Sequence, residues 1–273
     1  MLEHSKALAT AIEAAQAAGA LMRRNLRAAK TINLSSPHDI KLELDVRCQK
    51  LIERIVRPAC PAAAFLGEEG AGGDPQAKFR WVVDPIDGTV NFTYGIPHAC
   101  VSIAFQGRKT TGLRRTGGKP NRPRRETEYI TLVGVVYDPF SNELWTAVRG
   151  QRARLNGTTI RVSDRPLRES IVSLGFAKSR ESIRQMLPCL NWLLPRVRKV
   201  RMMGAAALGL TYVASGRFDA YLEGGIRLWD IAAGGLILEC AGGDFWHRPL
   251  PGNHRYELIA NNGRLRPHLR PWL

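Results

Sequence analysis

Four acidic side chains lie around one short apolar run in the first third of the chain. Asp84 and Asp87 follow the run Trp81–Val83, and Glu68 and Glu69 precede it. A proline between the two aspartates and a glycine after them turn the chain sharply, so both carboxylates leave the end of a rigid strand. Carboxylate oxygens are hard ligands, which favour magnesium. The pattern predicts a magnesium site at this strand end.

The next two residues, Gly88 and Thr89, can begin a helix. The free N–H groups and the dipole of a helix N-terminus favour a phosphate there. Carboxylates for a metal beside a phosphate cradle indicate phosphoryl chemistry. The residues alone leave a second interpretation open, in which Asp84 and Asp87 only cap a turn.

Helices and strands must bring these residues together. Apolar residues at helical spacing predict amphipathic helices over 5–29 and 43–58, the second ended by Pro58. The dipeptide Asn156-Gly157 predicts a hairpin, because it supplies the positive φ angles of a type I′ turn. Short apolar runs bounded by glycine and proline predict a largely antiparallel sheet. Its strands are expected over 63–66, 80–83, 100–105, 129–137 and 143–148.

The second half of the chain alternates strands with helices, which predicts a second sheet covered by helices. We expect one α+β domain over 1–273, with approximate halves 1–168 (N-terminal helices and antiparallel sheet) and 169–273 (an α/β substrate-binding half). Strands are expected near 170–174, 200, 219–223 and 258–260, and helices over 181–194, 205–215 and 229–241.

The composition is that of a globular protein with an unusual charge. The chain has 273 residues, of which 44% are hydrophobic and 23% are charged, and these values exclude a disordered, collagen-like or disulfide-scaffold protein. Its 40 basic and 24 acidic residues give a net charge of +16, which attracts polyanions at low salt.

The five cysteines are widely spaced and form no C-x-x-C pair, and their odd number disfavours a disulfide framework. This favours a reducing compartment. The longest uncharged apolar run, 202–216, is too short to span a bilayer. The N-terminus has the charges of an amphipathic helix rather than of a signal peptide. We therefore expect a cytoplasmic protein.

The segment 107–128 has neither the strand pattern of the first half nor the strand–helix alternation of the second half. It holds eight basic and two acidic side chains, a net charge of +6, with two prolines and no apolar period. We expect a solvated insertion between two strands, outside the catalytic wall. A sharper interpretation makes it an electrostatic arm for nucleic acid or another polyanion.

Three linked motifs resemble the inositol monophosphatase family, in its bacterial type. They are GEE at 67–69, WVVDPIDGTVNF at 81–92 and LWDIAAGGLILECAGG at 228–243. The resemblance implies a layered αβαβα sandwich of the inositol monophosphatase and sugar phosphatase type. It further implies magnesium-dependent hydrolysis of a phosphate monoester, inhibition by lithium, and a homodimer.

The resemblance also implies roles for particular residues. Glu68, Asp84 and the carbonyl of Ile86 would hold a first Mg²⁺, and Asp84, Asp87 and Asp230 a second. Two such metals clamp the attacking and leaving oxygens of an in-line displacement.

Further roles concern the water and the substrate. Glu68 and Thr89, the latter hydrogen-bonded to Asp45, would activate the attacking water. The expected substrate contacts surround the phosphate and the polyol hydroxyls: Asp87, Gly88, Thr89, Gly204, Ala205, Ala206, Glu223 and Asp230. Because Asn91 stands where related histidinol and nucleotide phosphatases usually have lysine, the resemblance favours inositol phosphate.

The chain departs from the family pattern before Asp45. The loop 33–38 lacks the lysine common in the family, and Leu42 stands where threonine is usual. Since every expected metal carboxylate remains, we expect catalysis to be retained, with a weaker third metal or altered loop closure.

Two alternatives stay open. A related sugar phosphatase, acting for instance on fructose 1,6-bisphosphate, would share the metal site and differ in its substrate wall. A basic protein that uses this fold to bind nucleic acid or a partner would explain the charge, although a complete acidic metal set argues against lost activity.

Overall fold

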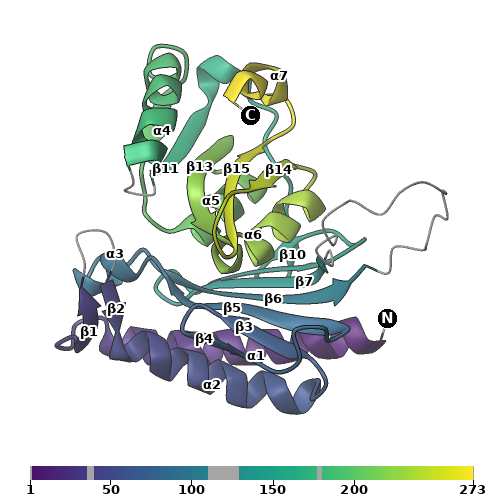
Figure 1. Ribbon diagram of the computed structural model, residues 1–273. Coiled ribbons are helices and arrows are strands. Elements are labelled where there is room, and N and C mark those ends of the chain that lie inside the picture. Colours follow the sequence, from purple (N-terminus) through teal and green to yellow (C-terminus); the bar gives the residue numbers. More distant parts are fainter. Residues whose placement is uncertain (1, 36–39, 110–128, 177–179, 273) are drawn as a thin grey trace, which may run out of the picture.

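The computed structural model describes residues 2–35, 40–109, 129–176 and 180–272. The described chain forms five layers that alternate helices with sheets (Figure 1). A helix pair covers a large sheet, a second helix pair separates it from a smaller sheet, and further helices cover that sheet. This confirms the expected αβαβα sandwich.

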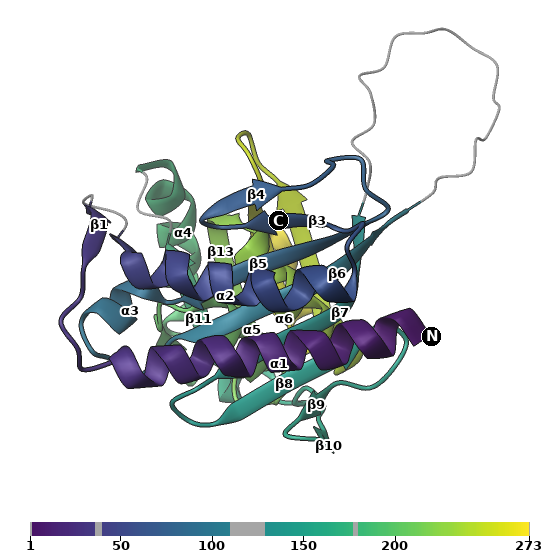
Figure 2. The same cartoon turned by 90° about the horizontal axis from the view of Figure 1, so that it is seen from below.

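The first layer consists of α1 (Leu2–Asn25) and α2 (Glu43–Ala59), which lie side by side under the large sheet (Figure 2). Residues three or four apart form the buried face of each helix, as an amphipathic helix requires. In α1 these are Ala7, Ala11, Ala14, Ala15, Ala18 and Met22, and in α2 they are Leu44, Cys48, Ile52 and Val56.

The large sheet has eight described strands in the order β10-β9-β8-β7-β6-β5-β3-β4. All neighbours are antiparallel except β3 and β5. In the hairpin, Asn156 and Gly157 have φ of 47° and 81°, which confirms the positive φ angles expected there. The strands are β3 (Ala64–Gly67), β4 (Gly70–Gly72), β5 (Phe79–Asp87), β6 (Cys100–Arg108), β7 (Tyr129–Asp138), β8 (Glu143–Val148), β9 (Arg154–Leu155) and β10 (Thr158–Thr159).

The middle helices, α5 (Ala206–Ala214) and α6 (Leu228–Cys240), are buried on nearly all sides. Both carry mostly apolar side chains on all sides, as a helix between two sheets must; the charged exceptions are Asp230 and Glu239 near the two ends of α6. They approach the large sheet closely: a Cβ on Gly134 of β7 would lie 2.7 Å from the carbonyl oxygen of Ala233 in α6.

The small sheet has the order β12-β11-β13-β15-β14. Its strands are β11 (Ile171–Phe176), β12 (Lys199–Arg201), β13 (Ala220–Arg227), β14 (Asp244–Pro249) and β15 (Arg255–Asn261). Its outer face is covered by α4 (Arg180–Leu193) and α7 (Arg266–Leu269), and short 3₁₀ turns occupy Leu167–Glu169 and Arg270–Trp272.

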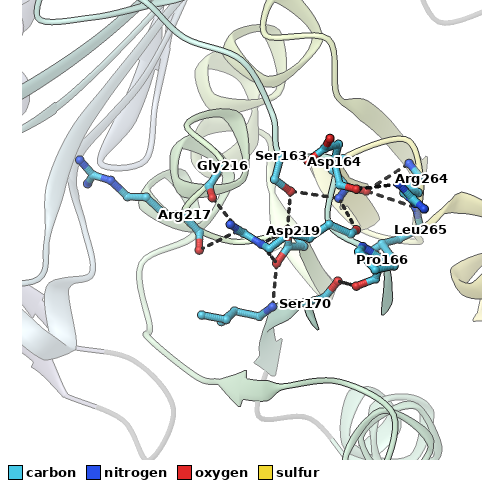
Figure 3. Close-up of polar contacts among 12 residues, drawn as sticks. Ser163, Asp164, Pro166, Ser170, Gly216, Arg217, Asp219, Arg264 and Leu265 are labelled. Atoms are coloured by element: carbon cyan, nitrogen blue, oxygen red, sulfur yellow. Dashed lines mark hydrogen bonds and ion pairs between the residues drawn. The ribbon is translucent and has the colours of Figure 1, made fainter. Parts of the chain in front are cut away.

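One buried carboxylate ties the small sheet to the segment that enters it. Asp219, directly before β13, accepts hydrogen bonds from Arg165 Nε at 3.0 Å, from Ile171 N at 2.7 Å and from the hydroxyl of Ser163 (Figure 3). Asn262 N donates to the carbonyl oxygen of Asp219 at 3.0 Å. The charge is therefore paired and fully hydrogen-bonded, as burial requires.

Several expectations need correction. The first helix ends at Asn25, and β6 continues through Arg108, so the basic insertion begins after that strand and not at Gly107. Residues 110–128 of the insertion and 36–39 of the lysine-free loop lie outside the described residues.

Five short strands and helices were not expected, nor were the two 3₁₀ turns: the paired strands β1 (Ile32–Ser35) and β2 (Ile40–Leu42), the strands β4 and β14, and the helix α7. The division into halves 1–168 and 169–273 stays a prediction. No helix in the described part of the chain is long and apolar enough to cross a membrane.

Candidate functional site

The acidic motif lies where β5 ends. The pairing of β5 with β6 is interrupted between Asp84 and Asp87, because Pro85 has no N–H to donate and the strand bulges there. Both aspartates are buried, with 2% and 7% of their surface exposed. Ile86 is also buried, and Glu68 is half-buried in the turn between β3 and β4.

Four carboxylates lie close enough in this region to affect one another's charge: Glu68, Asp84 and Asp87 of the acidic motif, and Asp230 on α6. Burial, followed by the charge of Glu68, raises the pKa of Asp84 and of Asp230 well above the ordinary value, and the charge of Asp87 adds to both effects. A buried cluster of like charges is unfavourable without a cation. A bound cation would relieve this repulsion.

Backbone N–H groups orient these side chains. Ile86 N donates to Asp84 Oδ1 at 3.0 Å, and Arg227 N donates to Asp230 Oδ2 at 2.9 Å. Asp45 is held in the same way, since Leu42 N donates to its Oδ2 at 2.7 Å. Asp45 and Asp230 are thus the third residues of α2 and α6, and the N-cap of α6 is Arg227. Asp45 is buried rather than exposed on its helix.

Asp87 faces the N-terminus of α5, 119 residues further along the chain. Its two oxygens accept hydrogen bonds from Ala206 N at 3.1 Å and Ala207 N at 2.7 Å, and the Cys100 thiol lies 3.6 Å away. Burial raises the pKa of Asp87 to about 6, although these donors favour its charged form. Ala206, one of the expected substrate residues, thus donates its backbone N–H to Asp87.

Gly88 and Thr89 begin a helix, as expected, but α3 (Thr89–Thr93) is only five residues long. Gly88 has φ of 91°, and a Cβ there would lie 2.9 Å from His98 O, so glycine is required. Thr89 Oγ1 donates to the carbonyl oxygen of Ile86 at 2.9 Å. The contact between Thr89 and Asp45 stays a prediction.

The donor set suits a hard divalent cation. Carboxylates and one backbone carbonyl are the oxygen ligands that magnesium accepts. Among the described residues, no group of three or more His, Cys, Asp or Glu side chains is arranged so that it could hold a metal ion. Both oxygens of Asp87, for example, accept hydrogen bonds from α5. A carboxylate that accepts these bonds still has lone pairs for a metal.

A cavity of about 470 Å³ opens beside the carboxylates. It brings together six of the expected substrate residues, namely Asp87, Gly204, Ala205, Ala206, Glu223 and Asp230. Gly88 and Thr89 do not line it. Sequence reasoning missed other lining residues, among them Phe176, Met202, Met203 and Arg227, which no motif distinguishes in the sequence.

Glu223 projects into this cavity from β13. Burial raises its pKa to about 7, the charge of Asp87 adds to the rise, and the Tyr221 hydroxyl donates to Oε2 and opposes it. Gly175 on the neighbouring strand leaves the space that the carboxylate occupies, since a Cβ there would collide with it. Glu223 thus places a carboxylate on the wall of the cavity.

Asn91 lines the cavity and bridges two segments of the chain. Its Nδ2 donates to His98 O at 3.0 Å and to Met203 O at 2.8 Å, and a Cβ on Gly204 would lie 3.3 Å from that nitrogen. A lysine could not make both contacts in this space. Asn91 therefore fixes the backbone that leads into Gly204 and Ala205.

Known proteins share this sequence and architecture. The model of the inositol monophosphatase family matches residues 3–113 and 127–268, which leaves the centre of the basic insertion unmatched. A protein named Nus factor SuhB from Xylella fastidiosa is 36% identical over 92% of this chain and 88% of its own length. An inositol monophosphatase from Mesembryanthemum crystallinum is 35% identical over 86% of this chain and 83% of its own length. The structure of an inositol monophosphatase from Anabaena superposes with a TM-score of 0.78 and 32% identity, covering 97% of this chain and 94% of that one.

Proposed function

Because the chain belongs to the inositol monophosphatase family, we propose that it is a magnesium-dependent phosphate monoester hydrolase that acts on inositol monophosphate. The observation that carries the proposal is the group of four buried or half-buried carboxylates beside a cavity lined by hydroxyl-accepting groups. The family and the relatives named inositol monophosphatase support the reaction class.

Glu68, Asp84, Asp87, Asp230 and the carbonyl of Ile86 would hold the metal. The raised pKa values of Asp84, Asp87 and Asp230 support this assignment, since a divalent cation would stabilise the charged forms that burial disfavours. Bound magnesium supplies positive charge that acidifies a water molecule and stabilises the leaving alkoxide.

The protein side chains would do the remaining work. Thr89 and Asp45, with Glu68, would orient the attacking water and receive its proton. Asp87 connects the end of β5 to the N-terminus of α5 through two hydrogen bonds. It would thereby hold the metal-binding carboxylates in a fixed position relative to the part of the cavity that receives the polyol. Glu223 and Asp230 would accept hydrogen bonds from the polyol hydroxyls. Such positioning is a large part of catalysis in phosphoryl transfer.

Phosphate release from a panel of monoesters, with and without Mg²⁺, tests the proposal. Inositol 1-phosphate should be hydrolysed, and chelation should abolish most of the rate. Lithium should inhibit, because we expect it to occupy the site formed by Asp84, Asp87 and Asp230. Turnover unaffected by chelator would refute the metal assignment. Faster release from fructose 1,6-bisphosphate in direct competition would favour the sugar phosphatase alternative.

A second candidate function is binding of a polyanionic partner, with the fold as scaffold. It is favoured by four exposed basic residues on and beside the edge strand β12, namely Arg196, Arg198, Lys199 and Arg201, and by relatives named Nus factor SuhB. RNA retained on a column with a steep salt dependence would support it. The homodimer and the cytoplasmic location also stay proposals, and sedimentation tests the first.

A further inference from the structure

The turn that carries Glu68 is anchored to the protein from two sides. It joins β3 to β4, and Glu68 N donates to the carbonyl oxygen of Val83 on β5 at 3.2 Å. Val83 directly precedes Asp84 in the chain. The first anchor of the turn is therefore the same strand that carries the buried aspartates.

The second anchor is Gln49 on α2. Its Oε1 accepts a hydrogen bond from Glu69 N at 2.9 Å, and its Nε2 donates to the carbonyl oxygen of Gly70 at 3.3 Å. A carboxamide offers both an acceptor and a donor, so one side chain satisfies both of these backbone groups. Gln49 thus fixes the two residues that directly follow Glu68.

The surrounding residues leave room for this side chain. Gln49 is buried, and a Cβ on Gly67 would collide with its Oε1. A larger residue at position 67 would therefore push the carboxamide away from the turn. Gln49 also lies one helical turn after the buried Asp45, so the two side chains project from the same face of α2.

We propose that Gln49 is a positioning residue for the metal site, which holds Glu68 in place through the two backbone groups next to it. The inference rests on the proposed function, which assigns Glu68 to the metal. Glu68 lies close enough to Asp84 and Asp230 for its charge to raise the pKa of both. Gln49 does not line the cavity, so it acts only through the turn. Removing a group that orients a metal ligand typically costs about 10- to 100-fold in metal affinity or activity.

Gln49→Met tests the proposal, because it removes both hydrogen bonds and keeps an unbranched side chain of similar size. Calorimetric titration of the metal-stripped protein with Mg²⁺ should show a dissociation constant raised about tenfold. The Mg²⁺ concentration that gives half the maximal rate on inositol 1-phosphate should rise by the same factor. The kcat at saturating Mg²⁺ should stay close to that of wild type. Gly67→Ala displaces the carboxamide from the opposite side and should weaken Mg²⁺ binding in the same way, which keeps the test open if Gln49→Met does not fold.

Gln106→Met is the matched control for the loss of a buried glutamine. Gln106 is buried and makes two side-chain hydrogen bonds, to Arg80 and Thr131. Its partner Arg80 lies near the opposite end of β5 from the aspartates. The control should lower the urea midpoint of unfolding and leave the Mg²⁺ dissociation constant unchanged.

Glu68→Gln separates positioning from general destabilisation. In that background Gln49→Met should weaken Mg²⁺ binding no further, because the ligand that it orients is already lost. An unchanged dissociation constant in Gln49→Met, equal fold-losses with and without Glu68, or a similar loss in the control would overturn the positioning role. If the wild type binds Mg²⁺ but hydrolyses no inositol phosphate, the proposed function fails and the calorimetry still decides the role of Gln49. A wild type that binds no Mg²⁺ would overturn both.

Discussion

Glu223 should make the stability of the metal-free protein depend on pH. Burial raises its pKa from 4.5 to about 7. Because one pKa unit corresponds to about 1.4 kcal/mol, this shift corresponds to about 3 kcal/mol in the free energy of unfolding. Since the side chain lines an open cavity and is partly exposed, this value is an upper bound. The free energy of unfolding is therefore highest below pH 4.5, where the carboxyl is protonated in both states, and it falls by up to this amount as the pH rises to about 7.

Glu223→Gln removes this titration and keeps an oxygen that can accept the Tyr221 hydroxyl. Urea unfolding in the presence of chelator at pH 4.5, 6, 7 and 8 should give similar free energies for the two proteins at the lowest pH. At pH 8 the variant should be more stable relative to wild type by up to about 3 kcal/mol. Its KM for inositol 1-phosphate should rise, because a charged acceptor is lost.

Glu169→Gln is the matched control, because Glu169 is exposed and outside the cavity. Its stability difference from wild type should not change with pH beyond a few tenths of a kcal/mol. A Glu223→Gln difference that stays constant from pH 4.5 to 8 would refute the argument that burial disfavours this carboxylate.

Four further changes have defined expected results. Asp84→Asn should lower kcat at least 100-fold with an unchanged circular dichroism spectrum, and activity above a tenth of wild type would contradict its role. Asp219→Asn should cost about 3 kcal/mol in urea unfolding, because it breaks a buried ion pair; a cost below 1 kcal/mol would contradict that account. Gly134→Ala should cost about 1–3 kcal/mol by forcing a methyl group against Ala233 O, and a neutral result would show that α6 can shift. Replacing 110–128 with a short glycine-containing turn should preserve kcat on inositol 1-phosphate; loss of turnover in a folded variant would place the insertion at the active site.

Local patterns predicted the elements that carry most of the carboxylates proposed as metal ligands. Three local signals each indicate one conformation without any tertiary contact. Apolar residues at helical spacing indicate α1 and α2, the apolar run before Asp84 indicates a strand, and the dipeptide Asn156-Gly157 indicates a hairpin turn. The local pattern also included Glu68, whereas only the resemblance to known motifs supplied Asp230, which lies far from that run in sequence.

Other features depend on contacts that the local sequence does not encode. Asp87 accepts hydrogen bonds from the start of α5 only because the two sheets enclose that helix. The pairing of Arg227 with Arg255 depends on the register of β13 and β15, which includes a bulge after Gly224. The strand β14 mixes charged residues with a terminal proline, as edge strands do, and therefore lacks the alternation that predicts a strand.

The most direct test of the central claim is the rate of phosphate release from inositol 1-phosphate by metal-stripped protein as Mg²⁺ is added. The carboxylate cluster predicts almost no release without metal, a saturable rise with Mg²⁺, and no comparable rise for Asp84→Asn. Release by the metal-stripped protein at the full rate, or an equal rise in the variant, would contradict the assignment of these carboxylates to a catalytic metal.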